Sequence, residues 1–292
     1  MRKILRVIQS PRAGNSLMIL VIGIALLTAA GIIAPGFLGT ANLFNLWRQA
    51  VPLGLVGIGQ TLAILIGGVD LSVGAVAMLS NMLSAKIMSG VDANNLTALA
   101  VCVAAAVLIG AFNGFGIVRF GINPFVMTLA TGIVIHGANL VYSKGGSGGA
   151  ASPLLVFLGV GKIGQFPVAV LFWLFFSLLV VVILDRSLFG RRLYAVGANP
   201  QAAHLSGVNT KAVVIVVYII SALTSMLAGL VVTGIMGVGT LEWGIDYRLI
   251  SLAVVVMGGT SFAGGRGGYW GTFFSVLRSE EHTSELQSRQ VI

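Results

Sequence analysis

The sequence predicts an all-α protein, a polytopic bundle of transmembrane helices, and three observations support this fold class. Hydrophobic residues make up 57% of the 292 residues and charged residues only 9%, whereas soluble domains carry about 25% charged residues. Apolar runs that approach or exceed the roughly 20 residues needed to cross a bilayer recur along the chain. Basic residues gather at two points between these runs, as they do in cytoplasmic loops. A soluble globular protein is therefore excluded.

Eight membrane spans are expected, within a single membrane domain. They cover residues 17–34, 51–66, 71–88, 96–118, 125–142, 166–184, 212–238 and 249–262. The second and third spans are short, and only four residues from Gly67 to Asp70 separate them. A broken or re-entrant helix is one interpretation of this pair.

Two clusters of basic residues orient the bundle in the membrane lipid. Arg2, Lys3, Arg6 and Arg12 precede the first span, and Arg186, Arg191, Arg192 and Lys211 follow the sixth. An even number of crossings lies between the clusters, so both are expected in the cytoplasm together with the N-terminus. The Gly-rich segment 143–165 then lies outside. This bias accounts for the net charge of +9, and no nucleic-acid partner is expected.

The last fifteen residues differ in character from the rest of the chain. Residues 278–292 read RSEEHTSELQSRQVI and interrupt an apolar segment. RSEEHTSELQS resembles the in-frame translation of a sequencing-library adapter. We therefore expect the transmembrane domain to cover residues 1–277 and the remainder to be a translation artefact.

The chain lacks the common motifs of catalysis and metal binding. It contains no G-x-x-x-x-G-K-[ST], no H-E-x-x-H, no G-x-S-x-G and a single cysteine, Cys102. We expect no catalytic residues, no metal site and no ATP hydrolysis by this chain. Among the acidic residues only Asp70 lies close between two spans, which disfavours an ion-driven carrier, because such carriers need buried ionisable groups.

A polar island at residues 185–211 interrupts the apolar sequence. Within it Asn199 can cap a helix, Pro200 suits the first helical position, and Gly207 supplies a left-handed stop. The intervening residues close barely one or two turns, and so short a helix is marginal unless a partner holds it. The segment is therefore expected to dock a cytoplasmic protein.

Four segments bring a family resemblance. QAAHLSG at 201–207 resembles the EAA-x-x-x-G motif of ABC importer permeases, with Gln201 in place of Glu. GGVDLSVG at 67–74 is similar to a signature of the ribose-type sugar permeases, as are NPFVMTLAT at 123–131 and the Gly-rich pattern at 251–271, in which Ser251 and Leu252 depart from the usual residues. The chain is identified as a member of the ribose-type sugar ABC permeases, the inner membrane components of binding-protein-dependent transport systems.

The resemblance implies the membrane subunit of a bacterial sugar importer in the cytoplasmic (inner) membrane. Its implied partners are an ABC ATPase subunit that uses ATP, a periplasmic sugar-binding protein and a second permease copy, as a homodimer or heterodimer. The chain itself binds no cofactor. Family members have about ten crossings, so this chain would be C-terminally truncated. The implied coupling helix comprises Asn199, Pro200, Gln201, Ala202, Ala203 and Gly207, in which the two alanines permit close approach to the ATPase.

Two groups of residues are candidates for the gate or the sugar path. The first is the turn with Gly67, Gly68, Asp70 and Ser72, where Asp70 would accept sugar hydroxyls or pair with a cation such as Arg119, and Asp70 or Ser72 would cap the next helix; a tight buried turn is the alternative. The second is Thr128, Thr131, His136 and Asn139, which share one broad helical face; interhelical hydrogen bonds are the alternative.

Gln60, Asn81 and Asn113 are weaker candidates for the sugar path. Ala106, Gly110 and Gly114 are small residues at a spacing of four, and they predict a surface where one helix packs against another.

Two other functions remain open at this point. One is an ABC permease for branched-chain amino acids or nucleosides, against which the intact GGVDLSVG argues. The other is an ATP-independent sugar facilitator or an ion-coupled carrier, which the docking segment and the scarcity of charge in the spans both disfavour.

Overall fold

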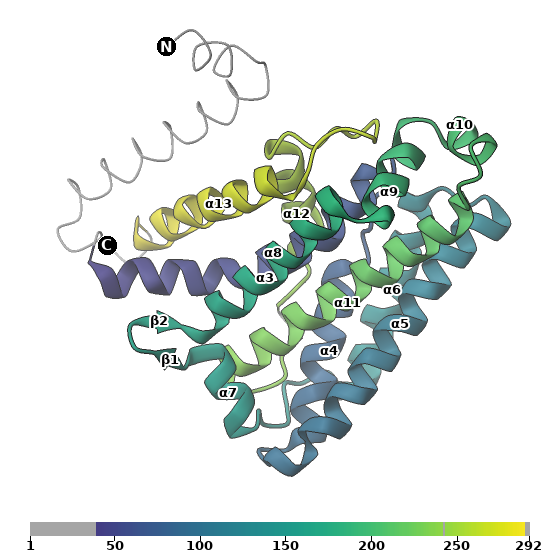
Figure 1. Ribbon diagram of the computed structural model, residues 1–292. Helices are drawn as coiled ribbons and strands as arrows, with labels where there is room; N and C mark the ends of the chain where they lie inside the picture. Colours follow the sequence, from purple (N-terminus) through teal and green to yellow (C-terminus); the bar gives the residue numbers. More distant parts are fainter. Residues whose placement is uncertain (1–38, 242, 290–292) are drawn as a thin grey trace, which may run out of the picture.

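The computed structural model describes residues 39–241 and 243–289, and in this part the chain is almost entirely helical (Figure 1). The helices are α3 (Thr40–Leu65), α4 (Val73–Met88), η1 (Asp92–Asn94), α5 (Asn95–Phe120), α6 (Pro124–Ser143), α7 (Pro153–Val160), α8 (Val168–Arg186), α9 (Leu188–Ala198), α10 (Pro200–Leu205), α11 (Thr210–Met236), α12 (Tyr247–Met257) and α13 (Tyr269–Arg289). Strands β1 (Lys162–Ile163) and β2 (Phe166–Pro167) form one short antiparallel hairpin. The predicted span at 17–34 and the basic residues before it lie outside the described residues.

Four helices in the described residues are long and apolar enough to cross a membrane. They are α5 together with η1, α6, α8 and α11. These helices correspond to the predicted spans 96–118, 125–142, 166–184 and 212–238. The prediction of an all-α, polytopic membrane protein is confirmed.

The second and third predicted spans differ from each other in length. The span at 51–66 was predicted too short, because α3 continues through Pro52 and begins at Thr40. The third, predicted at 71–88, corresponds to α4, which has 16 residues, or about 24 Å, and is therefore shorter than the ~30 Å thickness of the hydrocarbon core. Residues 66–72 between the two helices are not helical.

Three other features differ from the sequence prediction. Helix α12 ends at Met257 rather than at residue 262, because Gly259 adopts a left-handed φ of +86° directly after the C-cap Gly258. Helix α7 and the hairpin occupy the Gly-rich segment 143–165, and α9 precedes the predicted short helix in the polar island. Both unpredicted helices begin at a serine whose hydroxyl accepts a backbone N–H bond, Ser152 for α7 and Ser187 for α9.

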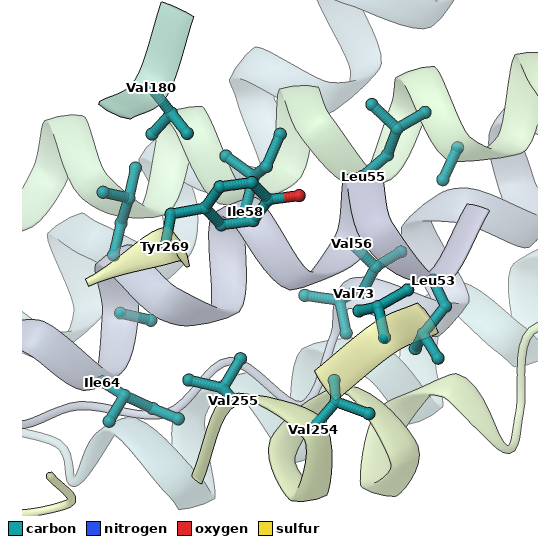
Figure 2. Packing of buried hydrophobic residues seen from close by; sticks show 14 of the residues in the cluster. Leu53, Leu55, Val56, Ile58, Ile64, Val73, Val180, Val254, Val255 and Tyr269 are labelled. Atoms are coloured by element: carbon teal, nitrogen blue, oxygen red, sulfur yellow. The ribbon is translucent and has the colours of Figure 1, made fainter. Parts of the chain in front are cut away.

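The core lies around α3 and α11. Helix α11 packs against α3, α4, α5 and α7, and α3 also packs against α8, α12 and α13. Figure 2 shows part of this apolar cluster, to which α3 contributes Leu55 and Ile58, α8 contributes Val180, α12 contributes Val254 and α13 contributes Tyr269. Burial of such a cluster orders the helices that carry the polar residues described below.

The predicted seam of small residues on α5 is confirmed as a helix-packing surface. A Cβ on Gly110 would stand 2.6 Å from the Ile219 Cα of α11, and one on Gly114 would stand 2.7 Å from the Ile215 Cα. Ala106 is buried. The two helices therefore approach along their backbones, as small residues permit between membrane helices.

Candidate functional site

The break between α3 and α4 is a non-helical segment, residues 66–72, that is held inside the protein. Gly67 has a φ of +76°, a conformation that side chains disfavour. A Cβ on Gly68 would stand 2.5 Å from the Tyr218 hydroxyl, so no larger residue fits there. The two glycines end α3 in a tight buried turn, and of the two only Gly67 adopts a left-handed conformation.

Asp70 lies at the centre of this break and is completely buried. One carboxylate oxygen accepts hydrogen bonds from the Ser72 backbone N–H at 2.9 Å and the Ser72 hydroxyl at 2.6 Å. The other accepts from the Ser221 hydroxyl of α11 at 2.7 Å. Because Ser221 lies near the middle of α11, the break lies well inside the bundle, where irregular backbone is tolerated only if protein or a water-filled cavity surrounds it.

Two predictions about this segment were wrong. Arg119 is exposed at the end of α5, so it is not the partner of the fully buried Asp70, whose recorded partners are serines. Neither Asp70 nor Ser72 caps the first amides of α4 through its side chain. The Ser72 hydroxyl instead donates to Asp70 and accepts from the Asn113 amide at 3.0 Å.

The polar face of α6 meets the same break. Thr128 accepts a hydrogen bond from the Leu71 backbone N–H at 2.9 Å, and its hydroxyl lies 2.8 Å from the Pro124 carbonyl oxygen. Thr131 donates to the Met127 carbonyl oxygen of its own helix at 2.9 Å. Thr128 therefore ties α6 to the break, as the hydrogen-bonding alternative predicts, whereas Thr131 is satisfied locally.

Several buried polar atoms lack a partner among the described residues. Among them are both side-chain polar atoms of Asn139 and of Gln60, the Asn113 Oδ1 and the His136 Nδ1. Asn139, Gln60 and Asn113 are fully buried and His136 is half-buried. An unpaired buried amide costs about 1–3 kcal/mol, so these groups are available to bind water or a polar ligand.

Of the three weaker candidates for the sugar path, Asn81 is the one whose side-chain nitrogen and oxygen both have hydrogen-bond partners. Its amide nitrogen donates to the Thr233 hydroxyl at 2.9 Å, and its oxygen accepts from the Thr240 backbone N–H at 2.7 Å. Asn81 therefore holds the segment after α11 against α4. The sequence did not point to Ser221 or Tyr218, because only helix packing shows that they face the break.

Helix α10 has the predicted local structure of the docking segment. The Asn199 side-chain oxygen accepts from the Gln201 and Ala202 backbone N–H groups, both at 3.0 Å, and Pro200 is the first helical residue. Gly207 follows with a φ of +81°. Figure 1 shows α10 at the end of the bundle opposite α7.

The exposed surface of α10 differs from the predicted one. Ala203 is only 4% exposed and packs into the chain, so the prediction that it contacts a partner was wrong. Gln201 and Ala202 are exposed, and the Leu205 side chain is 88% exposed. Leu205 is therefore the largest apolar side chain on the exposed side of α10, and sequence reasoning missed its exposure.

No metal site is found in the described part of the chain. Residues 39–241 and 243–289 contain no group of three His, Cys, Asp or Glu side chains that could hold a metal ion.

Comparisons with known proteins agree with the family resemblance. The family described as branched-chain amino acid transport system / permease component matches residues 42–277. The ribose import permease protein RbsC of Bacillus subtilis is 39% identical over 86% of this chain and 79% of its own length. The D-allose transport system permease protein AlsC of Escherichia coli is 37% identical over 82% of this chain and 73% of its own length, and the fructose import permease protein FrcC of Rhizobium meliloti is 31% identical over 95% and 79%.

No solved structure matches the chain significantly. The family match covers most of the chain, and the four long apolar helices make it a multi-pass membrane protein. The chain belongs to the family of branched-chain amino acid transport system permease components, among which its similar relatives include sugar import permeases.

Proposed function

We propose that this chain is the permease subunit of an ATP-driven ABC importer for a monosaccharide or a related polyol. Relatives named for ribose, allose and fructose import are similar to it over more than four fifths of its length. The structural observation that carries the proposal is α10, a capped one-turn helix with an almost fully exposed leucine at one end of the bundle.

Helix α10 is the proposed coupling helix. Asn199, Pro200 and Gly207 shape it, Ala203 anchors it to the chain, and Gln201, Ala202 and Leu205 face outward. The outward side would fit a groove on the cytoplasmic ATPase subunit. The basic residues Arg191 and Arg192 on the preceding helix are also exposed, which supports a cytoplasmic location for this end and for the N-terminus.

The proposed work of the chain is conformational. ATP binding closes the paired ATPase subunits, the docked α10 helices move with them, and the interface between two permease copies alternates between outward-facing and inward-facing states. A periplasmic sugar-binding protein delivers the substrate to the outward-facing state. The phosphoryl chemistry belongs to the ATPase, and this chain binds no cofactor.

The proposed sugar path passes the break between α3 and α4. Asp70 and Ser72 bind one another, Asp70 also bonds to α11 and Ser72 to α5, so they position the break and do not bind sugar directly. The unpaired Asn113 Oδ1 and the unpaired Asn139 amide, together with His136, are the groups that would bind sugar hydroxyls. Gly67, Gly68, Thr128 and Thr131 keep the backbone of this region in place.

The test is reconstitution of the chain with its ATPase subunit and binding protein in liposomes. Uptake of a labelled monosaccharide that requires ATP, the ATPase and the binding protein is the expected result. Uptake of equal rate without ATP or ATPase would instead indicate a facilitator and contradict the proposal.

The family description gives a second candidate, an importer of branched-chain amino acids. The sugar importer and the amino-acid importer are distinguished in the same liposomes by which substrate stimulates ATP hydrolysis. Stimulation by binding protein loaded with leucine but not with any pentose, hexose or polyol would select the second candidate.

A further inference from the structure

Three distant segments of the chain meet at the last residue of α3. The Leu65 carbonyl oxygen accepts a hydrogen bond from the Gly265 backbone N–H at 2.8 Å. The last carbonyls of a helix have no partner within the helix, and here the loop between α12 and α13, residues 258–268, supplies one. The end of α3 is therefore fixed by a loop about 200 residues further along the chain.

Helix α9 contacts the same point through a glycine. A Cβ on Gly197 would stand 1.8 Å from the Leu65 carbonyl oxygen and 2.7 Å from the Gly265 nitrogen. A Cβ on Gly264 would stand 2.7 Å from the Gly197 carbonyl oxygen and 2.9 Å from the Gly67 nitrogen. We refer to Leu65, Gly67, Gly197, Gly264 and Gly265 as the glycine junction.

One side-chain hydrogen bond reinforces the glycine junction. The Tyr194 hydroxyl on α9 donates to the Gly267 carbonyl oxygen at 2.9 Å. Helix α9 and the loop 258–268 are therefore joined both through their backbones and through this tyrosine. Figure 1 shows this loop reaching toward α9 at the end of the bundle that carries α10.

The glycine junction lies between the two parts of the candidate site. On one side Gly197 is followed by Ala198 and then by Asn199, the residue that caps α10. On the other side Leu65 and Gly67 lead directly to Asp70 and its bond to Ser221. No side chain of flexible length lies between the backbones at this point, so a displacement of α9 cannot be absorbed by a change of rotamer.

We propose that the glycine junction is a rigid link that carries displacement of α10 to the break between α3 and α4. The inference rests on the proposed function, in which an ATPase subunit moves α10. It assigns Gly197, Gly265 and Tyr194 as positioning residues for coupling, although none of them touches substrate or lies on the outward side of α10.

The test is Gly197→Ala in the complete reconstituted importer. The added methyl group forces α9 away from Leu65, whereas the outward side of α10 is unchanged. We expect the amount of bound ATPase subunit to stay the same, and the sugar imported per ATP hydrolysed to fall by about tenfold, within the usual range of coupling between distant sites. The matched control is Gly137→Ala on α6, where an added Cβ meets nothing within 4 Å and import per ATP should not change.

A milder variant covers the case in which Gly197→Ala fails to reach the membrane. Tyr194→Phe removes the hydroxyl that donates to the Gly267 carbonyl oxygen and should lower import per ATP by a smaller factor with normal ATPase binding. Unchanged import per ATP in Tyr194→Phe, when Gly197→Ala does not assemble, overturns the proposal.

The failure of this inference differs from the failure of the proposed function. If the wild-type importer works and Gly197→Ala imports as much sugar per ATP, the junction is not a link and only this inference is lost. If the wild-type chain neither binds the ATPase subunit nor imports sugar, the proposed function is wrong and this inference is wrong with it.

Discussion

The Asp70 carboxylate accepts a hydrogen bond from the Ser221 hydroxyl at 2.7 Å, and this bond joins the break between α3 and α4 to the middle of α11. Its second oxygen is occupied by Ser72. A buried carboxylate is costly unless hydrogen bonds compensate it. Asp70 therefore holds the break and α11 in a fixed relation.

Asp70→Asn should impair transport more than folding. The amide nitrogen that replaces one oxygen cannot accept a bond from Ser72 or Ser221, while loss of the buried charge offsets part of the cost. We expect a stability change of about 1–3 kcal/mol and a roughly tenfold loss of uptake, equivalent to ~1.4 kcal/mol. Uptake per membrane-inserted chain measures this, with Asp246→Asn as the control at an exposed aspartate without a side-chain cap bond. Wild-type uptake at wild-type membrane levels would argue against a role for Asp70.

Replacing the two alanines of α10 by glutamate should give different defects. Ala203 is buried, so Ala203→Glu places an unpaired charge inside the protein. The free energy of unfolding should fall by roughly 3–5 kcal/mol, and the yield of folded chain should fall with it. Ala202 is exposed, so Ala202→Glu should fold normally and weaken ATPase binding. Detergent-solubilised yield and co-purified ATPase separate the two effects. Equal behaviour of the two variants would contradict the orientation of α10.

Gly110→Leu should disrupt packing between α5 and α11. The side chain would extend from a position where even a Cβ lies 2.6 Å from the Tyr218 carbonyl oxygen, and overpacking costs about 1–3 kcal/mol or more. Thermal denaturation in detergent should show the loss. The control is Gly137→Leu on α6, where an added Cβ is free; a similar loss in both variants would refute the specific seam.

Asn139→Leu should separate a structural role from a role in the sugar path. Asn139 is fully buried with both polar side-chain atoms unpaired in the described residues. Removing an unpaired amide should leave the fold as stable or more stable, by up to about 1–3 kcal/mol. Uptake should fall if the amide binds sugar or water in the path. A stable variant with normal uptake would remove Asn139 from the path.

The sequence predicted the long helices and the caps well because these depend on local signals. Apolar length located α5, α6, α8 and α11, and Asn199, Pro200 and Gly207 located α10 from their own conformational preferences. Helix α9 could have been found from Ser187, which caps it. The start of α3 was missed because its first turns carry the polar residues Asn45, Arg48 and Gln49, which interrupt the apolar run.

The partners of the site residues could not be predicted from sequence because they depend on packing. Ser221 is one of several small polar residues on α11, and only the approach of α3 and α11 brings it to Asp70. The burial of Ala203 and the exposure of Leu205 follow from how α10 lies on the chain. The contact between Gly197, Leu65 and Gly265 joins three segments far apart in sequence and has no local signal.

The most direct measurement of the central claim is ATPase binding by Leu205→Asp. The Leu205 side chain is 88% exposed, so the substitution should not change folding or membrane level, and it places a charge in the proposed apolar contact. We predict that co-purification of the ATPase subunit and ATP-dependent uptake both fall by at least about tenfold, as for the loss of an anchor residue at an interface. Wild-type ATPase binding and uptake in this variant would contradict the assignment of α10 as the coupling helix.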